Sequence, residues 1–357
     1  MGVWFSWLML FVGLVVILIG CDIFTNSIEW LGKKLELSEG MLGSIFAAVG
    51  TALPETLIPI VAVLFGGTEA TNHAHAVGLG AIIGAPFMLA TVAMLVTGTA
   101  VFIFSRRGRR TPTMKVNSRI ISRDIRFFLA AFVVALLSGF ITIWPLKVAI
   151  AISLLIYYGF YVYKHATDTG HASKEDIEDI SPLHFSRHSE DPPLFMVILQ
   201  TIAGVSLIVG AAYLFVQYVN DVATSMGVTP LVLSLIVVPL ATELPEKFNS
   251  VLWVRRSKDT LAMGNITGAM VFQSTLPVAF GLVFTEWRIG PDSWQAFLQA
   301  ALAIVASVIL FTAIARNGKL TARSLLISGV WYLVWLVLVF PFGDMVLELV
   351  RKLGWGV

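Results

Sequence analysis

Gly50-Thr51-Ala52-Leu53-Pro54-Glu55 lies inside one long apolar segment of the chain, and Ala241-Thr242-Glu243-Leu244-Pro245-Glu246 lies inside another. Each stretch is followed by a second apolar segment marked by two glycines, at 80–85 after the first and at 264–269 after the second. Glu246 follows Glu55 by 191 residues, and Gly264 follows Gly80 by 184. The conserved order and nearly equal spacing indicate an internal duplication.

The composition is that of a membrane protein. Of 357 residues, 57% are hydrophobic and only 13% are charged, which excludes an ordinary soluble domain. The single cysteine, Cys21, excludes an intramolecular disulfide. Cys21 ends a sequence similar to a lipoprotein cleavage box, but no Lys or Arg precedes Lys33. A retained transmembrane helix is therefore favoured over a lipidated signal peptide.

Apolar runs of about 20 residues, long enough to cross a bilayer, occur ten times along the chain. The fold class we expect is an all-α polytopic membrane protein with ten transmembrane helices. The predicted spans are 3–21, 40–65, 76–104, 127–142, 144–163, 194–217, 229–254, 261–285, 293–315 and 324–341.

Lys and Arg concentrate in alternate loops between these spans, and the strongest basic run lies at 106–126. The positive-inside rule makes these loops cytoplasmic and both termini external. One five-helix half then begins outside and the other inside, so the halves are predicted to be inverted repeats, a plan common in secondary transporters. We expect a first repeat at 1–163, a cytoplasmic linker at 164–193 and a second repeat at 194–357.

Histidines are expected only in loops. His73 and His75 are assigned to an external loop before the third span, as interfacial polar residues. The other four lie in the linker beside acidic residues, where a regulatory metal site or a pH sensor is conceivable. Their spacing matches no metal motif, and a flexible, solvated linker is the favoured interpretation. The four are His165, His171, His184 and His188.

Glu55 and Glu246 are the residues that point to chemistry. A charged side chain at the centre of a bilayer costs about 2.5–3.5 kcal/mol on insertion scales, so two of them in one repeated motif indicate a bound cation. Pro54 and Pro245 are predicted to kink or break their helices and to free carbonyl oxygens. The result would be an all-oxygen site suited to Ca²⁺ or Na⁺. The alternative is a pair of kinked helices whose glutamates are protonated or locally paired.

Gly-Thr-Ala-Leu-Pro-Glu and Ala-Thr-Glu-Leu-Pro-Glu resemble the Gly-Thr-Ser-Leu-Pro-Glu signatures of the cation/calcium antiporter superfamily, typified by the sodium/calcium exchangers. The two glycine segments resemble its Gly-Asn-x-x-Gly-Ser segments. The resemblance covers both repeat cores and the ten-helix layout, but not the linker. It implies a Ca²⁺ site made by carboxylates, threonine hydroxyls and backbone carbonyls. The implied ligands are Glu55, Glu246, Thr51, Thr242 and the carbonyls of Ala48 and Pro239.

Several positions depart from that pattern and have lost an oxygen ligand. The signature serine is Ala52 in the first repeat and Glu243 in the second, and the serine after each later glycine is an alanine, Ala85 or Ala269. The side-chain ligand four residues further on is matched by Leu89 in one half and by Gln273 in the other. Glu243 and Gln273 therefore remain candidate ligands.

Lys247 is a further departure, because it lies four residues after Glu243 at membrane depth. A Glu four residues before a Lys is the favourable order for a side-chain pair on a helix. Lys247 either only neutralises Glu243 for insertion or takes part in a transport cycle, and the sequence leaves both interpretations open.

The expected function is a secondary active antiporter that moves Ca²⁺, or a similar hard cation, in exchange for Na⁺ or H⁺ by alternating access. Retained carboxylates and lost hydroxyls are the argument for H⁺. A membrane sensor or scaffold that keeps the exchanger fold without transport is the alternative. An intramembrane enzyme is the weakest hypothesis, because no nucleophile and histidine pair is predicted at membrane depth.

The predicted partners are inorganic cations and the lipid bilayer, with no cofactor and no nucleic acid. The expected location is a prokaryotic plasma membrane, as an integral multi-pass protein. By family resemblance, the first and sixth helices, predicted to lack internal charges, are the pair that moves.

Overall fold

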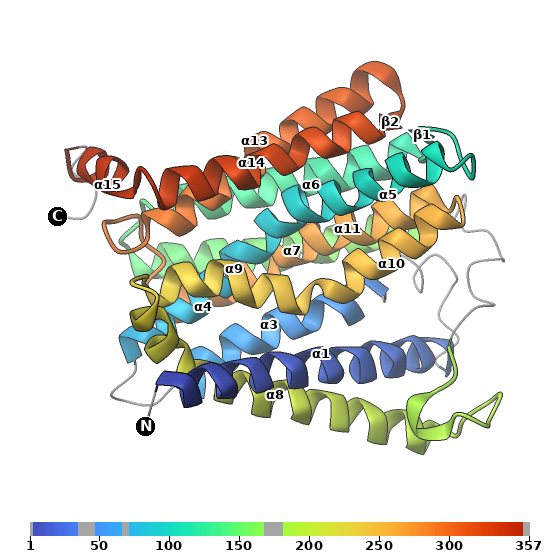
Figure 1. The fold of residues 1–357 in the computed structure, drawn as a ribbon, viewed down its shortest axis with the longest axis horizontal. Helices are drawn as coiled ribbons and strands as arrows, with labels where there is room; N and C mark the ends of the chain where they lie inside the picture. Colours follow the sequence, from blue (N-terminus) through green and yellow to red (C-terminus); the bar gives the residue numbers. More distant parts are fainter. Residues whose placement is uncertain (1–2, 35–46, 66–70, 168–180, 353–357) are drawn as a thin grey trace.

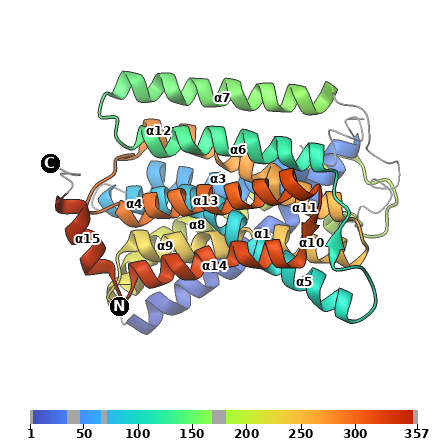
Figure 2. The same ribbon diagram turned by 90° about the horizontal axis from the view of Figure 1, so that it is seen from above.

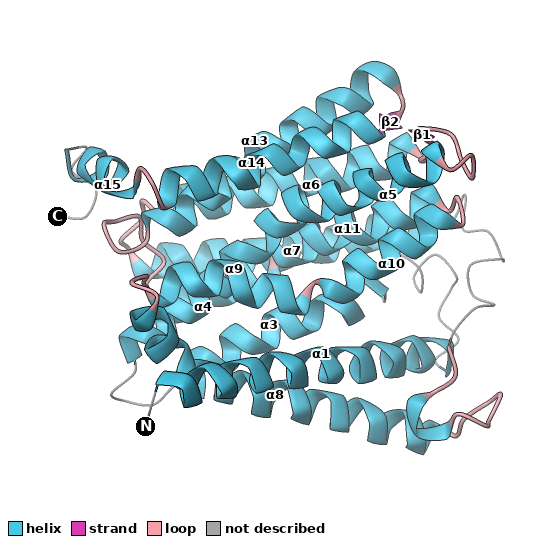
Figure 3. Ribbon diagram, viewed as in Figure 1, coloured by secondary structure: helices cyan, strands magenta, loops and turns pink. Residues whose placement is uncertain are grey.

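The computed structural model describes residues 3–34, 47–65, 71–167 and 181–352, which form a bundle of long, roughly parallel and antiparallel helices (Figure 1). Nearly all of this described chain is helical (Figure 3). The first five passes are α1 (Val3–Lys34), α3 (Ala47–Phe65), α4 (Thr71–Met88) continued by the π-helix η2 (Leu89–Ala93) and α5 (Met94–Arg106), α6 (Ser118–Ser138) and α7 (Trp144–Thr167).

The second five passes repeat this plan. They are α8 (Leu194–Ser225), α9 (Pro230–Thr242) with α10 (Leu244–Arg255), α11 (Asp259–Gln273) with α12 (Leu276–Phe284), α13 (Trp294–Asn317) and α14 (Ala322–Val339). A short helix, α15 (Gly343–Lys352), follows them. In the described chain, seven helices are long and apolar enough to cross a membrane, and α3, α6 and the broken pass of α9 with α10 complete the ten-helix plan.

Basic residues that the sequence assigns to cytoplasmic loops gather at one end of the bundle, on the right in Figure 1. Lys33 and Lys34 end α1, and Arg255 ends α10. The described part of the linker lies at this end, with the 3₁₀ turn η4 (His184–Ser186). So does a small antiparallel ladder, β1 (Thr113–Met114) with β2 (Leu320–Thr321). We refer to it as the linker end.

Inverted symmetry is visible where α1 packs along α8 (Figures 1 and 2). A Cβ atom added to Gly13 would lie 3.6 Å from the backbone nitrogen of Phe215, and one added to Gly204 would lie 2.8 Å from Cβ of Phe24. Gly204 follows Gly13 by 191 residues, and Phe215 follows Phe24 by 191. The two contacts are thus one contact made once from each half, as inverted repeats require, and the small residues allow the backbones to approach closely.

The repeats meet around a buried centre formed by α3, α4, α9, α10 and α11. A large apolar cluster, including Phe87, Phe128 and Trp287, packs these helices against α6, α12, α13 and α14. A second cluster, including Ile58 and Val238, joins them to α1 and α8. The α1 and α8 pair lies along one side of the bundle in Figure 1, with α13 and α14 on the opposite side.

Several helices extend beyond their predicted apolar runs. α1 continues to Lys34 rather than ending near residue 21, so it carries Asp22 and Glu29. α8 likewise continues to Ser225 rather than ending near residue 217, so it carries Asp221. The expectation that the first and sixth helices lack internal charges is therefore wrong. α6 begins at Ser118 rather than 127, because Asn117 Oδ1 accepts hydrogen bonds from Arg119 N and Ile120 N and caps it. Hydropathy misses such helix ends because they lie against protein or water rather than lipid.

The two signature prolines act differently. α9 ends at Thr242 and α10 begins at Leu244, so the seventh pass is broken as predicted. α3 is one helix from Ala47 to Phe65, uninterrupted at Pro54. Proline removes a single backbone donor, which a helix absorbs where neighbouring turns remain hydrogen-bonded.

Three histidines lie in helices and not in loops, which corrects the sequence prediction. His73 and His75 belong to the first turns of α4. His165 belongs to α7, is buried, and places Nε2 3.0 Å from Asp124 Oδ1 of α6. His171 lies outside the described residues.

Asp124 is the centre of a buried polar cluster that joins both repeats. Its Oδ1 accepts a hydrogen bond from Tyr161 at 3.2 Å, and its Oδ2 accepts one from Thr267 of α11 at 2.8 Å. Hydrogen-bonded partners on every side compensate for the burial of the carboxylate. The cluster fixes α11 against α6 and α7.

Candidate cation site

The break between α9 and α10 positions the candidate site. Glu243 is the residue between the two helices, with φ −89° and ψ 8°, and Pro245 lies in the first turn of α10. Proline has no amide hydrogen to donate to α9, but it fits the start of a new helix, where that donor is not needed. Glu243 and Glu246 are fully buried there, and Lys247 is 5% exposed.

Lys247 is paired as its spacing predicts. Its Nζ lies 3.1 Å from Glu243 Oε2 and donates a hydrogen bond to the Pro239 carbonyl oxygen at 3.4 Å. That same carbonyl accepts a hydrogen bond from Glu243 N at 3.2 Å. The carbonyl that the sequence predicts as a cation ligand is therefore engaged by the lysine ammonium in this structure.

Glu55 comes from α3 in the first repeat and is 2% exposed. It lies close enough to Glu246 and Glu243 for their charges to repel, and near Thr242. Neither carboxylate oxygen of Glu55 has a hydrogen bond of normal geometry among the described residues. The Thr242 hydroxyl donates to the Val238 carbonyl at 3.0 Å, which leaves its oxygen able to coordinate. The structure thus brings carboxylates from both repeats to one buried place.

α11 contributes two buried amides. Gln273, a predicted candidate, is fully buried, and Asn265, which the sequence argument did not select, is 4% exposed. In the described part of the chain, neither amide has a hydrogen-bond partner. A buried amide without a partner is costly, so such groups are expected to face a ligand or water. The signal for Asn265 was present, because it follows Gly264 in the repeated glycine segment.

The glycine segment of the first repeat holds α4 against α9. A Cβ atom on Gly80 would lie 2.9 Å from Ser234 Cβ, and one on Gly84 would lie 2.8 Å from Pro239 Cγ. Only glycine allows such an approach without displacing the neighbouring helix. The second motif of one repeat therefore supports the proline of the other.

Ala48 and Thr51 lie in α3, on the same helix as Glu55. Their side chains are outside the described part of the structure, so their predicted roles stay predictions. In the residues that are described, no three His, Cys, Asp or Glu side chains form a metal cluster. A cation at this site would therefore need neutral oxygens as well as carboxylates, which is the donor set that hard cations accept.

A sequence model of the family described as sodium/calcium exchanger protein matches residues 5–164 and 196–340. The two matched segments fall on the two halves of the duplication and together cover most of the chain. The chain belongs to the sodium/calcium exchanger family. Membership in this family makes the chain a transporter-family membrane protein rather than an enzyme, and it confirms the resemblance drawn from the signature motifs.

Curated relatives match most of the length of the chain at low identity. The chain is similar to the sodium/calcium exchanger MaX1 of Methanosarcina acetivorans, at 22% identity over 368 residues, which covers 94% of this chain and 98% of the relative.

Two solved structures show the same fold. One is the H⁺/Ca²⁺ exchanger CAX, with a TM-score of 0.70 and 16% identity over 94% of this chain and 81% of that chain. The other is the sodium-calcium exchanger NCX_Mj, with a TM-score of 0.57 and 19% identity over 94% and 99% of the two chains.

Proposed function

We propose that this protein is a secondary active antiporter that moves Ca²⁺, or a similar hard divalent cation, in exchange for H⁺ or Na⁺. The observation that carries the proposal is the burial of Glu55 and Glu246, both at most 2% exposed, contributed by opposite repeats and close enough for their charges to repel. Two buried like charges are unfavourable unless a counter-charge compensates them. One divalent cation would neutralise both carboxylates.

The proposed ligands are Glu55, Glu246, Thr51, Thr242, Gln273 and Glu243, with the carbonyls of Ala48 and Pro239. To these we add Asn265, because its buried amide has no partner among the described residues. The relatives named above act on Ca²⁺ with either Na⁺ or H⁺, which supports Ca²⁺ as substrate and leaves two candidates for the coupling ion.

For the coupling ion we favour H⁺. Ala52, Ala85, Leu89 and Ala269 are buried apolar residues at positions where the family pattern has oxygen ligands. Na⁺ needs oxygen ligands in place of its water shell, whereas a carboxylate couples to H⁺ by changing its protonation. Lys247 fits this scheme as a tethered positive charge, paired with Glu243 and Pro239 without the cation and displaced when the cation binds.

The membrane orientation follows from the linker end. Because the basic residues gather there, we propose that this end is cytoplasmic and that both chain termini are external. We also propose that the first repeat spans 1–163, the linker 164–193 and the second repeat 194–357. The membrane would be a prokaryotic plasma membrane.

Flux measurements test the proposal. Purified protein in proteoliposomes should accumulate ⁴⁵Ca²⁺ when a pH gradient is imposed, and Glu246→Gln should abolish the uptake. Glu348→Gln, which removes an exposed carboxylate on α15, is the matched control and should leave uptake unchanged. Uptake driven only by an Na⁺ gradient would replace H⁺ by Na⁺ as the coupling ion. Absence of flux under either gradient, with Ca²⁺ binding retained, would favour the sensor or scaffold.

A further inference from the structure

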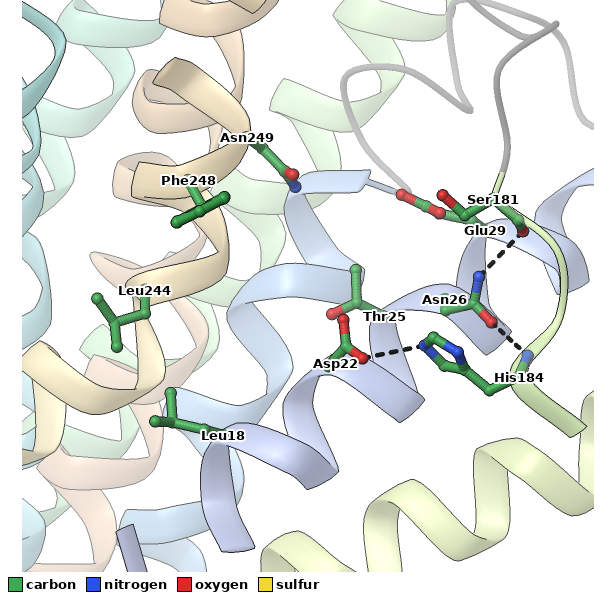
Figure 4. A pocket seen from close by; sticks show the side chains of 10 residues that line it. All are labelled: Leu18, Asp22, Thr25, Asn26, Glu29, Ser181, His184, Leu244, Phe248 and Asn249. Carbon is green, nitrogen blue, oxygen red and sulfur yellow. Dashed lines mark hydrogen bonds and ion pairs between the residues drawn. The ribbon is translucent and has the colours of Figure 1, made fainter. Parts of the chain in front are cut away.

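A cavity of about 340 Å³ lies between α1 and α10 near the linker end (Figure 4). Its walls combine polar side chains of α1, apolar side chains of α10 and the first described residues of the linker. The lining residues are Leu18, Asp22, Thr25, Asn26, Glu29, Ser181, His184, Leu244, Phe248 and Asn249.

The α1 wall carries two carboxylates and a hydroxyl without a hydrogen-bond partner among the described residues. Asp22 and Glu29 lie two helical turns apart, and Thr25 lies between them. The Thr25 side chain is 9% exposed, and its Oγ1 has no hydrogen-bond partner in the described structure. Figure 4 shows Thr25 beside Asp22 in the space between α1 and α10. An unpartnered hydroxyl next to a carboxylate offers oxygen ligands to a cation.

The opposite wall is formed by α10, the helix that also carries Glu246. Asn249 lines the cavity from α10, and it follows Glu246 by three residues, which is less than one helical turn. Glu246 is fully buried on the same helix. Less than one turn of α10 therefore lies between a residue that lines the cavity and a carboxylate of the proposed transport site.

The linker closes one side of the cavity and is held in place. His184 Nε2 lies 3.0 Å from Asp22 Oδ2, and His184 N donates to Asn26 Oδ1 at 3.2 Å. The Ser181 carbonyl accepts hydrogen bonds from Trp30 Nε1 at 2.9 Å and Asn26 Nδ2 at 3.2 Å. This part of the linker therefore docks on α1, which corrects the expectation of a solvated segment for residues 181–186.

We propose that this cavity is a second cation site, which holds a hydrated divalent cation between the solvent at the linker end and Glu246. The proposal deepens the function given above and rests on it for the role of Glu246. Asp22 and Glu29 are about 10.5 Å apart along the helix axis, too far for both to bind one bare ion directly. A water molecule occupies about 30 Å³, so the cavity accommodates a cation with its first hydration shell.

The cavity site would raise the concentration of cations next to the central site. Two carboxylates in a cavity with low-dielectric walls raise the local concentration of a divalent cation. The cation competes with His184 for Asp22, so occupancy loosens the linker contact on that side. Thr25 and Asn249 supply neutral oxygens that hydrogen-bond to the hydration shell.

Equilibrium binding of ⁴⁵Ca²⁺ to the purified full chain distinguishes the two sites. Wild type is expected to bind two ions, Asp22→Asn/Glu29→Gln one, Glu55→Gln/Glu246→Gln one, and the quadruple variant none. Glu190→Gln is the matched control, because it removes an exposed carboxylate of the linker outside the cavity, and it should leave two.

Each proposal fails in its own way. If Asp22→Asn/Glu29→Gln binds as many ions as wild type, the cavity site is overturned. If Glu55→Gln/Glu246→Gln still binds two ions, the central site is overturned while the cavity stands. Thr25→Val in the Glu55→Gln/Glu246→Gln background should weaken the remaining affinity about fivefold, the factor expected for one lost hydroxyl contact. Unchanged affinity there would remove Thr25 from the site.

Discussion

Leu89 and Gln273 occupy the same position in the two repeats, 184 residues apart, and regular α-helix is interrupted at both. Leu89 begins the π-helix η2, and Gln273 is the last residue of α11. Both side chains are fully buried. Irregular backbone at membrane depth is tolerated where it is enclosed by protein or lines a cavity, and π-segments are frequent at functional sites. Both repeats therefore depart from α-helical geometry at this position, although the side chains and the form of the departure differ.

Glu55→Gln and Glu246→Gln should each abolish high-affinity divalent binding, because each carboxylate supplies half of the charge that compensates a desolvated divalent ion. Isothermal titration calorimetry on purified protein with Ca²⁺ measures this. Glu348→Gln serves as control, and wild-type affinity at the central site in either single variant would contradict the assignment.

Lys247→Met should destabilise the fold by about 3–5 kcal/mol, because it leaves the buried Glu243 without its positive partner. Glu243→Gln/Lys247→Met removes both charges and should recover most of the loss. Denaturant unfolding in detergent, followed by circular dichroism, compares the two. Equal stability of the single and double variants would show that the pair contributes little.

Exchange should depend only weakly on Na⁺, and Glu243→Gln and Lys247→Met should both alter its pH dependence. The reason is that protonation of a buried carboxylate changes its interaction with Lys247 and with the cation. Flux is measured against external pH with and without Na⁺. A steep Na⁺ dependence that both variants leave untouched would reduce Glu243 and Lys247 to a structural ion pair.

Gly84→Ala should weaken cation binding and lower stability by about 1–3 kcal/mol, the usual cost of overpacking. The added Cβ would meet Pro239 Cγ at 2.8 Å and the Leu235 carbonyl oxygen at 2.9 Å, so α4 must move away from α9. Gly159→Ala on α7 is the matched control, since no atom lies within 4 Å of its added Cβ. Thermal unfolding and calorimetry report both effects; two variants of equal stability and affinity would contradict the close-packing argument.

The sequence was sufficient for features that depend on hydropathy and on repetition. Ten passes, inverted halves and the Glu243 with Lys247 pair follow from apolar length, loop charge and helical spacing, and the structure has them. Helix ends were harder, because Asp22 on α1 and Asp124 on α6 are charged residues that protein contacts accommodate within helices. A prediction from hydropathy assigns such charged residues to loops.

The roles of individual polar groups also depended on tertiary contacts. Pro54 lies in an unbroken helix whereas Pro245 starts a new one, although the two local motifs are alike. His165 was assigned to a loop because its partner Asp124 is 41 residues away in the chain. Asn265 could have been selected from its motif alone, since it matches the asparagine of the family segment.

Gly13 against Phe215 and Gly204 against Phe24 fasten α1 to α8 at two separated points. Helices packed closely at two separated points are expected to move together as one rigid unit, so neither tilts or slides while the other stays fixed. We expect a single joint movement of α1 and α8 to open the protein to one face of the membrane and to close it to the other. An intermediate open to both sides would require these contacts to separate, and their close packing opposes the leak that would otherwise dissipate the ion gradient.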